Sequence, residues 1–175
     1  MCEHQLLSTA MASQHKTEKR RKEIIEAAAS HLIEHGFQNS GLRAIAQSVG
    51  ISDRMIMYYF ETKDELVAEA LTMIGERLAA GMDSAVPSGN ATPDQIVNAL
   101  SSMMQSDDAQ AVMRLWFEII GLAMRGQQPY HKTAALLLEQ SEQQIRSKLR
   151  SDQKHRARDV LGTLEGRVMV GLLLT

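Results

Sequence analysis

Hydrophobic side chains recur at helical spacing along most of this chain. Between residues 17 and 35 they form one stripe of a helix, and Gly36 follows as a residue that can end it in the left-handed conformation. Further helical periods cover residues 92–105, 109–125, 130–151 and 155–174. No stretch alternates apolar and polar residues as a half-buried strand would. The pattern therefore predicts an all-α fold.

Two short helices are predicted between residues 40 and 59. Ser40 is placed to cap a helix that runs to about residue 49, Gly50 breaks it, and Ser52 is placed to cap a third helix over residues 53–59. Two short helices joined by a tight turn that contains glycine form the helix-turn-helix layout. Thr62 and Glu65 have the spacing of a capping box, which predicts a long fourth helix running to about residue 82.

Composition and charge narrow the function classes. The 175 residues are 44% hydrophobic and 23% charged, as in a soluble globular protein, and no apolar run reaches the roughly 18 residues that a membrane span needs. The N-terminus lacks the basic and apolar regions of a secretory signal, and the single cysteine, Cys2, fits a reducing compartment. We therefore expect a cytoplasmic protein that makes no membrane contact.

The net charge of −2 gives no global sign of a nucleic-acid partner, so a DNA-binding hypothesis depends on local charge. Five basic residues crowd positions 16–22 against one acid, Glu18. Such a run is either a solvated helix face or a contact with phosphates. We assign Lys16, Lys19 and Arg20 to a basic arm that would follow DNA. Residues 1–16 are predicted to be a disordered leader.

The segment from residue 36 to residue 66 resembles the N-terminal DNA-binding domain of the TetR family of bacterial transcriptional regulators. The resemblance rests on a glycine-aromatic pair, a cap, a short apolar helix, the turn glycine and a closing aromatic run followed by lysine and acid: Gly36, Phe37, Ser40, Leu42, Arg43, Ile45, Ala46, Val49, Gly50, Ile51, Ser52, Tyr58, Tyr59, Phe60, Lys63, Asp64 and Glu65. By motif it covers residues 17–66. It implies a DNA-binding domain over residues 17–64 and a helical effector-binding and dimerisation domain over residues 65–175.

A recognition helix must reach base edges in the major groove while other groups hold phosphates. Arg54 is the first choice for a base contact, because its guanidinium can bind O6 and N7 of guanine together. Helix N-termini favour anions, so Ser40, Ser52 and Lys63 are expected near phosphates. The family often has glycine at the position of Arg54 and tyrosine at that of Met57, so we expect the reading of bases to depart from the family pattern. Met57 fits simple packing equally well. The predicted DNA-binding residues are Ser40, Arg43, Ser52, Asp53, Arg54, Met57, Tyr58 and Lys63.

For the C-terminal domain, the resemblance implies a mostly apolar effector pocket and a homodimer formed through the last two helices. A methionine-lined cavity would suit varied apolar ligands, although the same stripe fits core packing. The candidate pocket residues are Met73, Met103, Met104, Met113, Trp116, Phe117, Ile120, Met124 and His131, with Glu118, Arg125 and Tyr130 as further polar candidates. The candidate dimer residues are Leu138, Ile145, Leu161, Leu164, Val168 and Leu172. The apolar run up to Thr175 predicts that the natural helix continues.

The sequence thus predicts a ligand-responsive, dimeric repressor that binds a palindromic double-stranded DNA operator, with no cofactor, catalytic residue or metal. One alternative is a helix-turn-helix dimer without any effector. A remote alternative is a zinc peptidase, because His31, Glu34 and His35 spell H-x-x-E-H on one helix. Its context is poor, since the inner face of that helix is needed for the core and no third ligand is identifiable.

Overall fold

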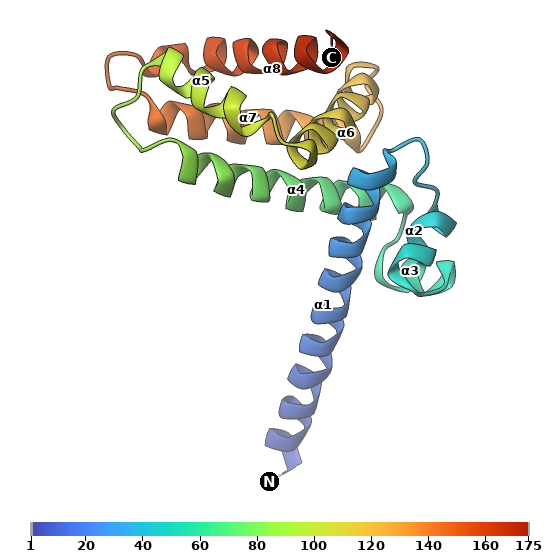
Figure 1. Cartoon of the computed structure of the whole chain (residues 1–175). Coiled ribbons are helices and arrows are strands. Elements are labelled where there is room, and N and C mark those ends of the chain that lie inside the picture. Colours follow the sequence, from blue (N-terminus) through green and yellow to red (C-terminus); the bar gives the residue numbers. More distant parts are fainter. Residues whose placement is uncertain (1, 175) are drawn as a thin grey trace.

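A computed structural model describes the backbone of residues 2–174 and the side chains of residues 14–174. Within that range the chain is all-α and contains no strand (Figure 1). The helices are α1 (Cys2–His35), α2 (Leu42–Val49), α3 (Asp53–Tyr59), α4 (Lys63–Ala85), α5 (Pro93–Met103), α6 (Asp107–Met124), α7 (Tyr130–Lys148), a 3-10 turn η1 (Lys154–Arg156) and α8 (Ala157–Leu174). We call residues 17–64 the head and residues 65–174 the body.

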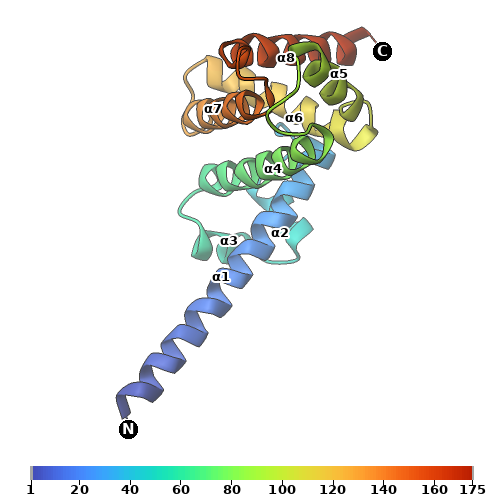
Figure 2. The ribbon, with the colours of Figure 1, turned by 90° about the vertical axis from the view of Figure 1, so that its left-hand side faces the viewer.

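The first helix begins earlier than predicted. The backbone is helical from Cys2, whereas the sequence predicted a disordered leader over residues 1–16. The reason is local, because no proline or glycine interrupts residues 2–35 and Leu, Ala, Met, Gln, Lys and Glu, which favour helices, are frequent there. The helix ends at His35, and Gly36 follows it at a φ of 75°. Figures 1 and 2 show the N-terminal half of α1 projecting away from the other helices.

The head and the body share one hydrophobic core. Ile24 and Leu32 of α1, Ile45 of α2, Ile56 of α3 and Leu66 of α4 are completely buried in it. Beyond α4, the body adds buried side chains of α6 and α7 to the same cluster, which are Leu115, Ile119, Leu122 and Tyr130. The core of the helix-turn-helix is therefore continuous with α6 and the start of α7.

A second hydrophobic cluster lies in the body. It joins the end of α4 to α5, α6, α7 and α8, and its fully buried members include Ile96, Leu100, Ile145 and Leu149. The N-terminal half of α4 belongs to the first cluster, while Met82, near its other end, belongs to the second. Helix α4 thus runs through both clusters and connects the head to the body (Figure 1).

The helix caps explain most of the boundaries. Thr62 accepts a hydrogen bond from the Glu65 N–H at 3.0 Å, as predicted. The other half of that capping box is not formed, because the Glu65 carboxylate accepts from the Glu61 N–H at 2.7 Å instead. A complete box starts α5, where Thr92 and Gln95 cap each other. No helix among the described residues is long and apolar enough to cross a membrane.

Candidate functional site

The turn between α2 and α3 is fixed by backbone hydrogen bonds. Gly50 has a φ of 74°, and its N–H donates to the carbonyl oxygens of Ala46 and Gln47. The Ile51 N–H donates to the Ala46 oxygen at 3.0 Å. Ser52 then caps α3 by accepting from the Met55 N–H at 3.2 Å, as the sequence predicts. These bonds hold α3 at one orientation relative to α2.

Helix α3 presents one exposed face and buries the other. Asp53, Arg54 and Met57 are exposed, and Tyr58 is 74% exposed. The opposite face is held by Ile56, which is completely buried, and is followed by the buried ring of Phe60. Met55 of the same helix is also exposed, and it was not among the predicted DNA-binding residues. The predicted outward face of α3 is therefore free of contacts with the core.

Ser40 does not have the predicted role. Its side chain is completely buried and its hydroxyl donates to the Gly36 oxygen at 2.6 Å. The N-cap position of α2 is Gly41, which has no side chain, so no side-chain hydrogen bond caps this helix. Ser40 instead satisfies a carbonyl just past the end of α1, and a buried hydroxyl cannot reach a phosphate.

The basic positions of α1 separate into two groups. Lys16 and Lys19 are exposed, and Arg20 pairs with Glu23 of its own helix at 2.8 Å, so these three predicted arm residues lie at the surface. Arg43 of α2 is exposed as well. Arg21 has a different role, which its sequence context did not reveal: its guanidinium pairs with Glu69 and, at 3.0 Å, with Glu65, both on α4.

Arg21 is a structural residue of the head. Its guanidinium also lies 4.5 Å from the centre of the Phe60 ring, and its Nε donates to the Tyr59 oxygen at 3.4 Å. The hydrogen bond with Glu69 is the largest cause that raises the pKa of Arg21. Arg21 therefore joins α1, the end of α3 and α4. Glu65 and Glu69 are one helical turn apart on α4, so both reach the same guanidinium.

A cluster of five residues connects the head to the body, and we call it the joint: Phe37, Lys63, Asp64, Glu118 and Tyr130. The Phe37 N–H donates to Oε2 of Glu118 at 2.7 Å, and the Tyr130 hydroxyl donates to Oδ1 of Asp64 at 2.5 Å. The Phe37 ring meets Tyr130 edge to face at 5.1 Å, and Nζ of Lys63 lies 4.9 Å from the Phe37 ring centre. Glu118 and Tyr130 are thus joint residues rather than pocket residues.

Two physical features fix the joint. Burial, followed by the hydrogen bond to Asp64, raises the pKa of Tyr130, so its hydroxyl stays protonated and continues to donate. Gly36 allows Glu118 to approach, because a Cβ at that position would lie 2.8 Å from Oε1 of Glu118. Sequence analysis missed this cluster, since its members are separated by up to 93 positions and share no motif.

A cavity of about 560 Å³ lies in the body between α4, α5, α6, α7 and α8. Its wall is mostly apolar, and the predicted residues Met103, Met104, Met113 and Trp116 line it. The indole Nε1 of Trp116 donates to both carboxylate oxygens of Glu165, at 3.1 and 3.2 Å. Helices α4 and α7 approach closely at the wall, because a Cβ on Gly75 would lie 2.6 Å from Cδ2 of Leu137.

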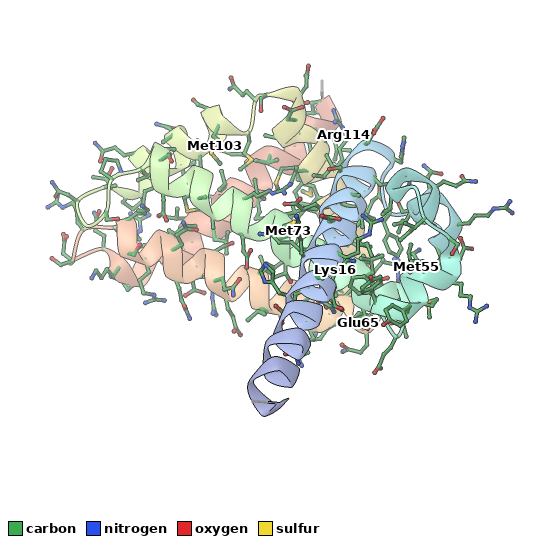
Figure 3. All side chains as sticks on the ribbon, turned by 90° about the horizontal axis from the view of Figure 1, so that it is seen from below. Lys16, Met55, Glu65, Met73, Met103 and Arg114 are labelled. Carbon is green, nitrogen blue, oxygen red and sulfur yellow. The ribbon has the colours of Figure 1, made fainter. Side chains whose placement is uncertain are left out.

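The remaining predicted pocket residues lie elsewhere. Met73 packs against the first hydrophobic cluster, and Figure 3 places it apart from Met103. Phe117 packs against the second hydrophobic cluster. Ile120 is half-buried and does not line the cavity, Met124 is 82% exposed, and His131 is exposed with Nδ1 3.0 Å from the Ala123 oxygen. The reason is that the turns of α6 beyond Trp116 pass the cavity and pack against the first cluster through Ile119 and Leu122.

The residues predicted to form the dimer interface fall into a buried group and a half-buried group. Ile145, Leu164 and Val168 are buried in the second cluster, on the inward faces of α7 and α8. Leu138, Leu161 and Leu172 are half-buried. The exposed large apolar side chains of α7 and α8 are Leu136, Met169, Val170, Leu173 and Leu174.

The H-x-x-E-H motif has a packing role. His31 is buried, its ring lies 4.5 Å from that of His35, and burial is the main cause that lowers the pKa of His31. Among the residues whose side chains the structure describes, no three His, Cys, Asp or Glu side chains are grouped so that they could hold a metal ion. The H-x-x-E-H sequence is therefore explained by two histidine side chains that lie at the edge of the core.

These features define a helix-turn-helix protein: a glycine turn, an exposed α3 and a helical body that contains a cavity. Residues 24–70 match the model of the family described as bacterial regulatory proteins, tetR family. This match, together with the all-helical fold, places the helix-turn-helix segment of the chain among sequences similar to that family.

Relatives agree with this placement. The HTH-type transcriptional regulator PksA of Bacillus subtilis (strain 168) is 28% identical over 114 residues, which are 65% of this chain and 56% of PksA, so the match spans little more than half of that protein. The fold is shared with SCO7518 of Streptomyces coelicolor A3(2) (TM-score 0.70, 24% identity, 86% of each chain). It is also shared with a TetR transcription regulator of Haloarcula marismortui ATCC 43049 (TM-score 0.70, 20% identity, covering 90% of this chain and 88% of that one). The multidrug binding protein EbrR complexed with proflavin has the same fold (TM-score 0.68, 23% identity, covering 88% of this chain and 89% of EbrR).

Proposed function

We propose that this protein is a cytoplasmic, ligand-responsive transcriptional repressor that binds a palindromic double-stranded DNA operator as a homodimer and is released by a small, largely apolar effector. The observation that carries the proposal is that α4 and α6 line the cavity and also hold the helix-turn-helix, through the shared core and the joint. The cavity favours this function over a helix-turn-helix dimer without an effector. The fold shared with EbrR, a multidrug binding protein, supports a ligand in the body.

On DNA, the exposed face of α3 enters the major groove. Arg54 contacts a base, because its guanidinium is exposed and has the donor geometry for guanine. The exposed hydroxyl of Tyr58 and the ammonium of Lys63, at the N-terminus of α4, bind phosphates, and Ser52, Asp53 and Met57 complete the surface. Lys16, Lys19, Arg20 and Arg43 add positive charge at the rim.

Release follows from the elements that the two sites share. Leu71, Ile74 and Leu78 of α4 and Leu115 and Trp116 of α6 line the cavity. Two residues after Trp116, Glu118 accepts the hydrogen bond from the Phe37 N–H. A ligand that shifts α6 or α4 therefore changes the position of the helix-turn-helix. It releases DNA only as far as it binds the released state more tightly than the DNA-bound state.

The test is selection of bound fragments from a random DNA library, followed by sedimentation of the complex. We expect a near-palindromic site with half-sites about 34 to 36 Å apart, occupied by two protomers. Recovery of no palindromic site, or a complex that holds a single protomer, would contradict the proposal.

A further inference from the structure

The wall of the cavity carries charge of one sign. Glu76 and Glu165 are the only ionisable residues among those that line it, so the wall contains no lysine, arginine or histidine. Glu76 is exposed, whereas Glu165 is partly buried. The other polar lining residues are neutral: Gln140, Ser141, Gln143, Gln144 and Ser147. The cavity therefore offers an anionic group and no cation to a ligand.

Glu165 is under-satisfied in its present surroundings. Among the described residues, its two carboxylate oxygens share a single donor, the Nε1–H of Trp116, at 3.1 and 3.2 Å. An ionised carboxylate accepts about four hydrogen bonds, and its burial without a charged partner is costly. Burial accordingly raises the pKa of Glu165, against the opposing effect of the Trp116 bond. A positive charge beside this carboxylate would relieve that cost.

The rest of the wall suits a flat, polarisable ligand body. Trp116 supplies an indole ring next to the carboxylate, and Met82, Met103, Met104 and Met113 supply flexible thioether side chains. Cations bind over indole faces, and methionine adapts to aromatic rings of different shape. A volume of about 560 Å³ is within the range of sites for drug-sized molecules.

We propose that the cavity binds an amphipathic aromatic cation, with its positive charge paired to Glu165 and its rings packed against Trp116 and the methionines. This inference rests on the proposed function, because it names the chemical class of the effector. Neutral apolar molecules of the same shape bind more weakly, since they leave the partly buried carboxylate without a partner.

The test compares two three-ring probes at about pH 8 by isothermal titration calorimetry: N-methylacridinium, a permanent cation, and acridine, which is neutral there. We expect the wild-type protein to bind the cation at least about tenfold more tightly, as the strength of charge-assisted hydrogen bonds and ion pairs implies. Glu165→Gln should remove this preference and leave the affinity for acridine within about twofold. Glu139→Gln, an exposed residue of α7 outside the cavity, is the matched control and should retain the preference.

Equal affinities for the two probes, an unchanged preference in Glu165→Gln, or failure of both probes to bind would overturn the inference. Should Glu165→Gln fail to fold, the wild-type protein provides the second measurement. Affinity for N-methylacridinium should fall as the pH is lowered and Glu165 becomes protonated, and a constant affinity down to pH 4.5, the ordinary pKa of a glutamate, would count against the inference. Operator binding is measured separately by fluorescence anisotropy without a probe, so failure of the proposed function would appear as absence of a DNA site whatever the probes do.

Discussion

Arg54 and Lys63 are predicted to contribute to DNA binding in different ways. Arg54 is exposed near the start of α3, while Lys63 is half-buried with its ammonium beside the Phe37 ring. We expect Arg54→Ala to relax base preference at one position, at a cost of about 1 to 3 kcal/mol on the preferred site. Lys63→Ala should weaken binding to all sequences alike and reduce the slope of log affinity against log salt by about one.

Fluorescence anisotropy on the selected operator and on single-base variants, repeated over a range of salt concentrations, checks both expectations. Lys154→Ala, an exposed residue of η1 in the body, is the control for loss of a positive charge outside the head. A uniform loss in Arg54→Ala, or a sequence-dependent loss in Lys63→Ala, would reverse the assignment.

For single residues, the sequence predicted which side chains are exposed better than it predicted which residues they contact. The exposed positions of α3 follow from helical period alone, because Ile56 has to face the core. The burial of Ser40 could not be predicted, since serine serves equally as a cap or as a donor to a nearby carbonyl. Arg21 could not be distinguished from its basic neighbours either, because its partners Glu65 and Glu69 lie more than 40 positions away.

Among the elements, the turn between α2 and α3 depends on a single backbone conformation. Gly50 has a φ of 74°, and a Cβ there would meet no atom within 4 Å, so only the backbone opposes a side chain. We expect Gly50→Ala to lower the free energy of unfolding by about 1 to 2 kcal/mol, measured by urea denaturation. Gly41, which has an equally open surrounding and a φ of −63°, is the control, and Gly41→Ala should change stability by no more than about 0.5 kcal/mol. Equal losses in both variants would contradict this account.

The order and type of the helices could be predicted from sequence, because caps and turn glycines such as Ser52, Thr62 and Gly50 are local signals. The pocket could not be predicted to the same extent. Helical period grouped Met113 and Trp116 with Ile120 and Met124, yet only the first two line the cavity, because its extent depends on how α4, α7 and α8 pack against α6. Glu165 was missed for the same reason.

For the whole molecule, the exposed apolar side chains of α8 indicate the surface of the proposed homodimer. Met169, Val170 and Leu173 are exposed, whereas Leu164 and Val168 belong to the protomer's own core. We expect Leu173→Glu to weaken the dimer by at least about tenfold, because the interface would bury an unpaired charge. Met124→Glu, an exposed apolar residue on α6, should leave the dimer intact.

Sedimentation equilibrium of the two variants and the wild-type protein measures this effect. Operator affinity should fall together with dimer affinity in Leu173→Glu, since each protomer supplies one α3. A dimer that resists Leu173→Glu but dissociates in Met124→Glu would move the interface to another face of the molecule.

The hydrogen bond from the Phe37 N–H to Glu118 has a thermodynamic consequence under the proposed function. If filling the cavity disturbs this bond and thereby weakens operator binding by some factor, then operator binding must weaken effector binding by that same factor. Copies of the protein on the operator would therefore respond at a higher effector concentration than free copies. The tightness of the promoter site, and not the cavity alone, would then set the concentration at which transcription begins.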